Sequence, residues 1–227
     1  MSSFPINLHK LLQGKTVEWE RLEFKEGWNP LEVVQTIVAF ANDINNWGGG
    51  YIAIGIRGKD GRPVLPPKGV EPARLDSMQK ELLNLCNQIK PPYFPIAQPV
   101  EYMGKQIFLI WVPGSETRPH QAPENLGKKH TYHYYIRRYS STVRVSQREV
   151  IDLVETSAKT PFDDQINQHA SLSDLSLGLI QAHLSAVNST LLEDSNTLPF
   201  PELCRKMNIV YGPDEYLKPK THRVAYV

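Results

Sequence analysis

The chain reads Glu18-Trp-Glu-Arg-Leu-Glu-Phe-Lys25, then Val38-Ala-Phe-Ala-Asn-Asp43, and then Gly48-Gly-Gly-Tyr-Ile-Ala-Ile-Gly-Ile56. Apolar and charged residues alternate over residues 20–25, which is typical of a half-buried β-strand. Asn29-Pro30 supplies an N-cap and a first-turn proline, so we expect a helix that ends before the glycines. The nearly all-apolar run that follows the glycines predicts a central strand with both faces covered.

The residues after this stretch mix helical and strand patterns and contain no internal repeat. Such an order predicts an α+β fold in two layers, with a mixed β-sheet covered by helices. We expect a short helix within residues 4–14, a helix over 73–90, strands over 94–102, 106–112 and 131–138, an irregular loop over 113–130, and a helix that begins at Ser146 and ends near residue 157.

A polar stretch containing proline divides the chain, and we interpret residues 158–172 as a linker. The first domain is therefore expected to cover residues 1–157. Residues 173–227 are expected to form a short helical tail or a truncated second domain, with helices near 175–184 and 201–209. A segment of this length is too small to bury a large core.

The composition restricts the class of protein. The net charge of the 227 residues is only +1, so any surface that binds nucleic acid must come from local segregation of charge. The two cysteines are far apart, which argues against a disulfide framework or a zinc knuckle. The N-terminus lacks a secretory pattern and no apolar run approaches membrane-spanning length, so we expect a cytoplasmic protein without a membrane partner.

The opening stretch resembles the Schlafen AlbA_2 family of nucleic-acid-binding domains. The shared blocks are Leu-Glu-Phe-Lys, Ala-Phe-Ala-Asn, Gly-Gly and Ile-Gly-Ile, and the later Tyr135-Ile-Arg137 and Ser140-Ser-Thr142 are similar to the family as well. The resemblance is densest over residues 18–61. It implies an AlbA_2-like module that binds DNA or RNA in a regulatory, transcriptional-regulator-like role. Family members often continue into an ATPase-like region, so we expect this chain to be a truncated or minimal member.

An acidic strand suggests a second function. Glu23 and Lys25 lie two residues apart, so their side chains share one strand face. Metal-dependent nucleases pair carboxylates that hold Mg²⁺ or Mn²⁺ with a lysine that stabilises charge. Glu18 joins Glu23 only if the chain bends between them. Schlafen-type ribonucleases carry two glutamates at similar spacing and an aspartate after the next strand, and here Asp60 is displaced from that place.

Three hypotheses therefore stand side by side. The first is a nucleic-acid-binding module. The second is a divalent-metal endoribonuclease, with Glu18 and Glu23 as tentative metal ligands, Lys25 stabilising charge and Asp60 as a further acid; the opposing interpretation is a solvated strand face with a surface ion pair. The third is a remnant without nucleic-acid activity that serves as an interaction piece, in a homo-oligomer or a larger assembly.

The binding residues are predicted from a stretch without acids, Asn125 to Arg148, in which cations and tyrosines are interleaved. Cations neutralise phosphates and tyrosines offer stacking faces. If Tyr134 and Ile136 face the core, then alternation directs His133, Tyr135 and Arg137 outward. The residues predicted to bind nucleic acid are Lys128, Lys129, Tyr135, Arg137, Arg138 and Arg144, with Arg57 and Lys59 extending the surface.

Two other patterns predict no site. Asn45 to Gly50 is rich in glycine, but its order of helix, glycines and strand is the reverse of a phosphate-binding loop, so we interpret it as a helix terminator. His120, His130 and His133 lie near one another in the sequence, but no carboxylate or cysteine completes a usual zinc spacing.

Overall fold

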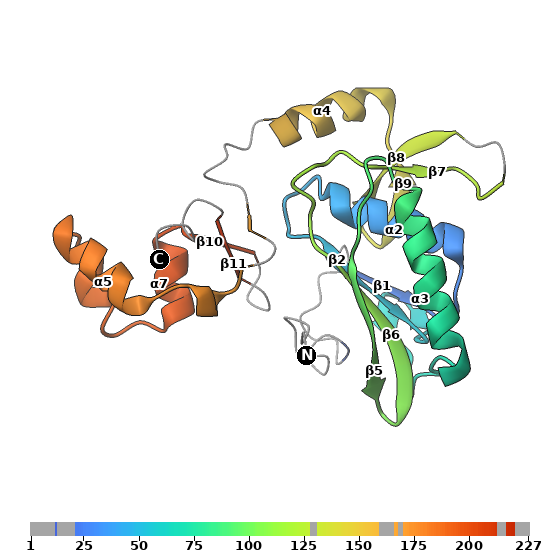
Figure 1. Cartoon of the computed structure of the whole chain (residues 1–227), viewed down its shortest axis with the longest axis horizontal. Coiled ribbons are helices and arrows are strands. Elements are labelled where there is room, and N and C mark those ends of the chain that lie inside the picture. Colours follow the sequence, from blue (N-terminus) through green and yellow to red (C-terminus); the bar gives the residue numbers. More distant parts are fainter. Residues whose placement is uncertain are drawn as a thin grey trace. The chain divides into compact units, whose positions relative to one another are not determined.

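The computed structural model describes residues 12, 21–127, 131–158, 166–167, 170–212 and 217–220. The chain divides into two compact units, Met1–Ser157 and Ala158–Val227, and each is described by itself (Figure 1). The predicted helix at residues 4–14 lies outside the described residues except for Leu12, which is buried. Most of the predicted linker also lies outside them.

The first unit is built on a mixed four-stranded sheet with the strand order β1-β2-β6-β5. Strand β1 (Leu22–Lys25) runs parallel to β2 (Gly50–Ile54), and both other pairings are antiparallel. Strands β5 (Ile96–Tyr102) and β6 (Lys105–Val112) form the predicted hairpin. Every residue of β2 is buried, which confirms the prediction of a central strand.

Two helices cover one face of this sheet. Helix α2 (Pro30–Asn42) begins where the sequence predicted, because the Asn29 side chain accepts a hydrogen bond from the backbone N–H of Glu32. Helix α3 (Pro72–Asn87) packs beside it. Alternate residues of β2 and β6 face these helices and complete the main core with them: Ile52, Ile54, Phe108, Ile110 and Val112.

A second, antiparallel sheet packs on the other side of α2 (Figure 1). Its strands are β7 (Gln121–Pro123), β8 (Tyr132–Arg138) and β9 (Ser141–Arg144). Strand β7 lies in the stretch expected to be an irregular loop, and β9 was not predicted. Both are short, so they carry too few residues for a periodic pattern.

Helix α4 (Gln147–Ala158) covers the opposite face of β8 through contacts that include Ile136 and Leu153. Its predicted start is confirmed: the backbone N–H of Ser146 donates to the Glu149 carboxylate at 2.8 Å, and the Ser146 hydroxyl donates to the same oxygen at 2.7 Å. Strand β8 is therefore covered on both faces, by α2 and by α4.

Asn42, at the end of α2, ties the layers together. It is fully buried, and its amide donates to the carbonyls of His120 at 3.0 Å and Tyr135 at 2.8 Å. Its side-chain oxygen accepts from the backbone N–H of His120 at 2.6 Å. One side chain thus satisfies three backbone groups from two other segments, as buried polar groups require.

The glycines that follow α2 are needed for close packing. A Cβ on Gly49 would lie 2.0 Å from the carbonyl oxygen of Val112, and one on Gly50 would lie 2.3 Å from the Phe40 ring. Gly49 also has a φ of +79°, which a glycine adopts readily. The predicted helix terminator is therefore also a place of close packing, where the chain passes next to the Val112 carbonyl and the Phe40 ring without room for a side chain.

The second unit contains three short α-helices and a small strand pair among its described residues. Helices α5 (Leu177–Ala186) and α7 (Phe200–Lys206) lie where the sequence predicted helices, with α6 (Leu191–Asp194) between them. Strands β10 (Val210–Tyr211) and β11 (Lys218–Pro219) pair antiparallel. No helix among the described residues of either unit is long and apolar enough to cross a bilayer.

Candidate nucleic-acid interface

The acidic strand β1 presents two of the predicted site residues together. Glu23 and Lys25 pair with Ile52 and Ile54 of β2, and therefore lie on the sheet face that α2 covers. The Lys25 ammonium lies 3.2 Å from one Glu23 carboxylate oxygen and 2.8 Å from Glu32, in the first turn of α2. The shared strand face is as predicted, and it is part of an ion-pair network.

Arg137 completes this network from the second sheet. Its guanidinium lies 2.9 Å from the other Glu23 carboxylate oxygen and donates to the Thr142 hydroxyl at 2.9 Å. The same group lies 5.0 Å from the centre of the Phe40 ring. The negative charge of Glu23 is therefore held between two cations.

The predicted outward orientation of Tyr135 and Arg137 is wrong. Both are buried, at 7% and 6% exposure, and the Tyr135 hydroxyl accepts a hydrogen bond from Gln35 of α2. The physical reason is that helices cover both faces of β8. Neither set of alternating side chains therefore points into solvent.

An open cleft of about 540 Å³ adjoins β1 and is named the β1 cleft. Glu23, Lys25 and Arg57, three of the residues predicted to form a site, line it together. Its full lining is Glu23, Phe24, Lys25, Glu26, Gly27, Trp28, Asn29, Glu32, Arg57 and Gly58.

A short hairpin rises beside the β1 cleft and is named the basic hairpin, residues Arg57 to Arg62. Its strands are β3 (Gly58–Lys59) and β4 (Arg62–Pro63), and the tip residues Asp60 and Gly61 have φ of +51° and +72°. Arg57, Lys59 and Arg62 are exposed and form no ion pair with any described residue. Three cations and one acid thus project from a single turn.

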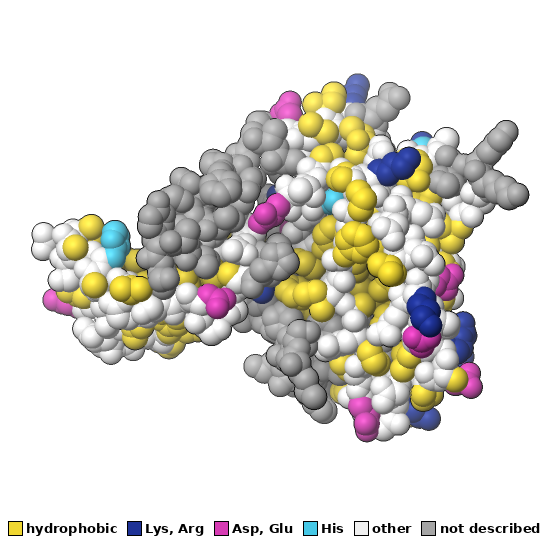
Figure 2. Space-filling model, in the orientation of Figure 1, with side chains coloured by type: hydrophobic (Ala, Val, Ile, Leu, Met, Phe, Trp, Pro, Cys, Tyr) yellow, Lys and Arg dark blue, Asp and Glu magenta, His cyan; other side chains and the backbone are white. Residues whose placement is uncertain are grey.

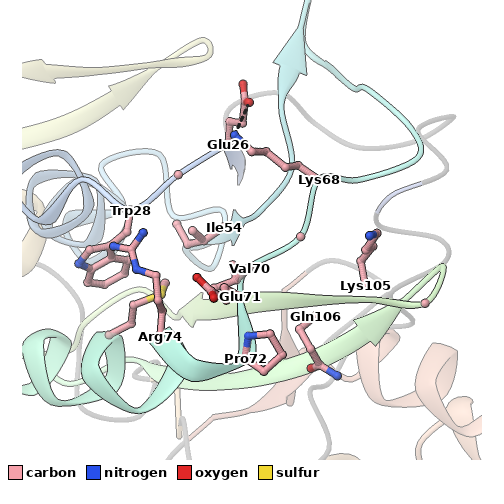
Figure 3. A pocket seen from close by; sticks show the side chains of 14 residues that line it. Glu26, Trp28, Ile54, Lys68, Val70, Glu71, Pro72, Arg74, Lys105 and Gln106 are labelled. Carbon is pink, nitrogen blue, oxygen red and sulfur yellow. Dashed lines mark hydrogen bonds and ion pairs between the residues drawn. The ribbon is translucent and has the colours of Figure 1, made fainter.

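A second cavity, of about 580 Å³, lies next to the first and is named the Trp28 pocket (Figure 3). It shares Glu26, Gly27 and Trp28 with the β1 cleft. In Figure 3, Trp28 and Arg74 lie at one end of the pocket, and Lys105 and Gln106 at the other. Its lining contains the cations Lys68, Arg74 and Lys105 and the acids Glu26 and Glu71.

The cations predicted on β8 and β9 are placed differently. Arg138 pairs with Glu149, and Arg144 lies 3.9 Å from Glu124. Hydrogen bonds from Ser146 and from Arg138 lower the pKa of Glu149 to about 2, so this partner is charged throughout the neutral range. Glu124 and Glu149 each lie one residue outside an end of the basic stretch, Asn125 to Arg148. A count of charges within that stretch therefore omits both acids.

Charge on the visible surface is dispersed. On the face drawn in Figure 2, the described Lys and Arg side chains form separate spots rather than one broad basic patch. Glu18, Lys128 and Lys129, three of the predicted site residues, lie outside the described residues.

The predicted metal site finds no support among the described residues. No three His, Cys, Asp or Glu side chains of the described residues gather as metal ligands. Both carboxylate oxygens of Glu23 face cations, and Asp60 lies at the exposed tip of the basic hairpin. These residues alone do not fit a divalent cation, which needs several oxygen ligands.

Sequence reasoning missed Arg62, Lys68, Arg74, Lys105 and Trp28. They come from separate segments: the loop after β1, the basic hairpin, the loop before α3, the start of α3 and the first residue of β6. No local pattern links such residues, and only the fold brings them together.

His120 is buried, and no described histidine joins it in a metal-ligand cluster, while His130 lies outside the described residues. Its ring nitrogens lie 2.8 Å from the Pro91 carbonyl oxygen and 2.6 Å from the Ser115 hydroxyl. Desolvation lowers the pKa of His120, and the bond to Pro91 opposes this only in part. The side chain is enclosed in the core at neutral charge.

This fold and this arrangement of motifs define an α/β domain with a mixed sheet. The chain belongs to the Schlafen AlbA_2 family, whose model matches residues 18–146. No curated protein matches the chain.

The solved structures that are similar to it include the following two. The DIP2311 protein from Corynebacterium diphtheriae shares 18% identity at a TM-score of 0.43, over 91% of this chain and 35% of that one. The chain thus spans about a third of that protein. The N-terminal domain of a RecG-related protein from Nitrosomonas europaea, whose name refers to an ATP-dependent DNA helicase, shares 22% identity at a TM-score of 0.43, over 65% of this chain and 94% of that one.

Proposed function

We propose that this protein is a nucleic-acid-binding module with a regulatory, transcriptional-regulator-like role, and that it contacts phosphates through the basic hairpin and the two cavities beside it. The observation that carries the proposal is the set of exposed cations Arg57, Lys59 and Arg62, which form no ion pair with described residues. They project next to cavities whose lining adds Lys68, Arg74 and Lys105.

Electrostatics favours a polyanion at this place. Six cations lie on the basic hairpin and around the Trp28 pocket, against Asp60, Glu26 and Glu71, and one of the six, Lys68, pairs with Glu26 at 3.0 Å. The β1 cleft adds Lys25, Glu23 and Glu32. A polyanion that approaches them gains attraction and releases counterions. A net charge of +1 for the whole chain is compatible with this, since attraction depends on the local field.

The cations of β8 and β9 have a smaller part in the proposal. Arg138 and Arg144 are already paired with acids, so phosphate must displace Glu149 or Glu124 to reach them. Lys25 in the β1 cleft is likewise shared between Glu23 and Glu32. Among the described residues no acid lies within ion-pair distance of the three cations of the basic hairpin, and Glu26 is close enough to Arg57 for a Coulombic interaction.

The proposal is tested by fluorescence anisotropy with labelled single- and double-stranded DNA and RNA over a salt series. A module that neutralises about three phosphates gives a slope of log affinity against log salt of about −2 for single strands. Replacing Arg57, Lys59 and Arg62 together by alanine is expected to lower affinity about 10- to 100-fold at low salt and to flatten the slope.

The matched control is Lys80→Ala, which removes an exposed cation from α3 that pairs with Asp76 and lines neither cavity. It should change affinity less than about twofold, because a paired surface cation contributes little. Absence of binding to every nucleic acid at low salt overturns the proposal. So does a triple variant that binds as well as the unaltered protein.

A further inference from the structure

The Trp28 pocket has features that phosphate contacts alone do not require. Its floor is apolar, with Ile54 and Met78 buried at 0% and 2% exposure, and its wall carries the indole of Trp28. A volume of about 580 Å³ lies in the range of small-molecule sites, roughly 300–1,000 Å³. A pocket of this kind suits a flat, partly apolar group.

The indole is held in place before any ligand arrives. Its Nε1 donates to Glu81 of α3 at 2.7 Å, and its ring lies 6.1 Å from the ring of Phe108. The loop with Gly69 and Val70, which also lines the pocket, is fixed by backbone bonds from Gly69 to Gly55, at 2.9 Å, and from Val70 to Gln106, at 2.7 Å. A ligand therefore meets a preformed aromatic site and loses little free energy in ordering it.

Two polar side chains in the pocket have hydrogen-bonding capacity to spare. Glu71 precedes α3 but makes no side-chain capping bond, and neither it nor the Gln106 amide bonds to another described side chain. Figure 3 shows Glu71 between the Trp28 end of the pocket and the Gln106 end. A carboxylate and an amide offer the acceptors and donors that the edge of a nucleobase pairs with.

We infer that the Trp28 pocket receives an unstacked base of a single-stranded nucleic acid, while the phosphates on either side of it lie on the basic hairpin and the cations of the pocket rim. The two cavities meet at Glu26, Gly27 and Trp28, so one strand can occupy both. Base stacking on aromatic side chains is the usual way in which proteins hold single strands. This inference rests on the proposed function and deepens it by naming the substrate class.

The decisive probe is an oligonucleotide whose backbone is complete but whose sugars carry no bases. It keeps every phosphate, and so the proposed function predicts binding to it. The inference predicts that it binds at least about 10-fold more weakly than the same strand with bases, because the stacking contribution is lost. A duplex, whose bases are paired and stacked, should also bind more weakly, and free mononucleotides should compete poorly.

Gly27 offers a variant that closes the passage between the cavities. A Cβ at this position meets no atom within 4 Å and its φ is not in the left-handed region, so Gly27→Leu is expected to fold. It should lower the affinity for single strands about 10-fold, and it should reduce the preference for strands with bases over strands without them. Arg74→Ala on the pocket rim should lower the affinity for single strands about three- to tenfold, with Lys80→Ala as its control on the same helix.

A direct readout comes from strands that carry 5-iodouracil, irradiated and mapped by mass spectrometry. Crosslinks in the peptide that contains Trp28 or Met78 support the inference. Equal affinity for strands with and without bases overturns it and leaves the proposed function intact, as does competition by mononucleotides at the affinity of the strand. No binding to any of these probes contradicts the proposed function itself.

Discussion

The family pattern of this chain separates into an exposed part and a buried part. Glu23 and Lys25 open onto the β1 cleft, whereas Asn42, Gly49 and Gly50 are buried and packed closely against other parts of the chain. Both parts belong to the same short stretch of sequence. The difference teaches that a shared motif combines residues that position the layers with residues that meet a ligand, and burial tells them apart.

The largest effect is expected for Gly50→Ala, in the buried part. The new Cβ would lie 2.3 Å from the Phe40 ring and 2.6 Å from the backbone oxygen of Arg21, so the substitution should destabilise the fold by about 4 kcal/mol or prevent folding. Gly27→Ala, with open space around its Cβ, should stay within about 0.5 kcal/mol. Urea unfolding followed by circular dichroism compares them, and equal midpoints would show that burial does not separate the two parts.

Asn42→Leu should come next. It leaves two carbonyls and one N–H buried without their partner, which is expected to reduce the free energy of unfolding by about 3 kcal/mol. Asn87→Ala is the control, since that exposed amide bonds only to Leu83 on its own helix. Nucleic-acid affinity, measured at a temperature where Asn42→Leu is folded, should change less than about twofold. A large loss of affinity in the folded variant would mean that the buried part also touches the ligand.

A pH series sharpens the comparison through His120. Burial lowers its pKa below the value of 6.5 that it has when unfolded, so the unfolded chain binds more protons around that pH. Stability should therefore be complete above about pH 6.5 and fall as the pH drops below it. Melting temperatures of the protein and of His120→Gln, with His183→Asn as the exposed control, check this: only the first substitution should flatten the slope. A slope unchanged in His120→Gln would assign the titration to another group.

The smallest effect on stability is expected for Arg57→Ala, in the exposed part. Arg57 makes no ion pair with a described residue, so unfolding should change by less than about 0.5 kcal/mol. Its affinity for single strands should nevertheless fall about three- to tenfold through loss of one phosphate contact. Anisotropy and urea unfolding on the same sample provide both numbers. A loss of stability with unchanged affinity would show that Arg57 stabilises the fold and does not contact the nucleic acid.

Much of the fold could be predicted because the signals are local. The Asn29 cap, the hairpin of β5 and β6, and the Ser146 start of α4 each depend on residues only a few positions apart. The all-apolar β2 was likewise readable as a central strand.

The site could be predicted only in part, since it depends on contacts between distant segments. The grouping of Glu23 and Lys25 follows from strand geometry and was predicted. The burial of Arg137 against Glu23, which is 114 positions away, arises because α2 and α4 enclose β8, and alternation within one strand carries no information about that. The Trp28 pocket likewise has no counterpart in any single stretch of the chain.

The wall between the two cavities consists of three consecutive residues, Glu26, Gly27 and Trp28, which line both of them. Glu26 is anchored to Lys68 at 3.0 Å, Trp28 to Glu81 at 2.7 Å, and the glycine between them is exposed. Such a tethered wall belongs to both compartments, so an occupant that shifts it on one side alters the free energy of filling the other. By thermodynamic linkage, the change in binding free energy is the same in both directions. A ligand in one cavity would then change the affinity of the other cavity without contacting the ligand bound there.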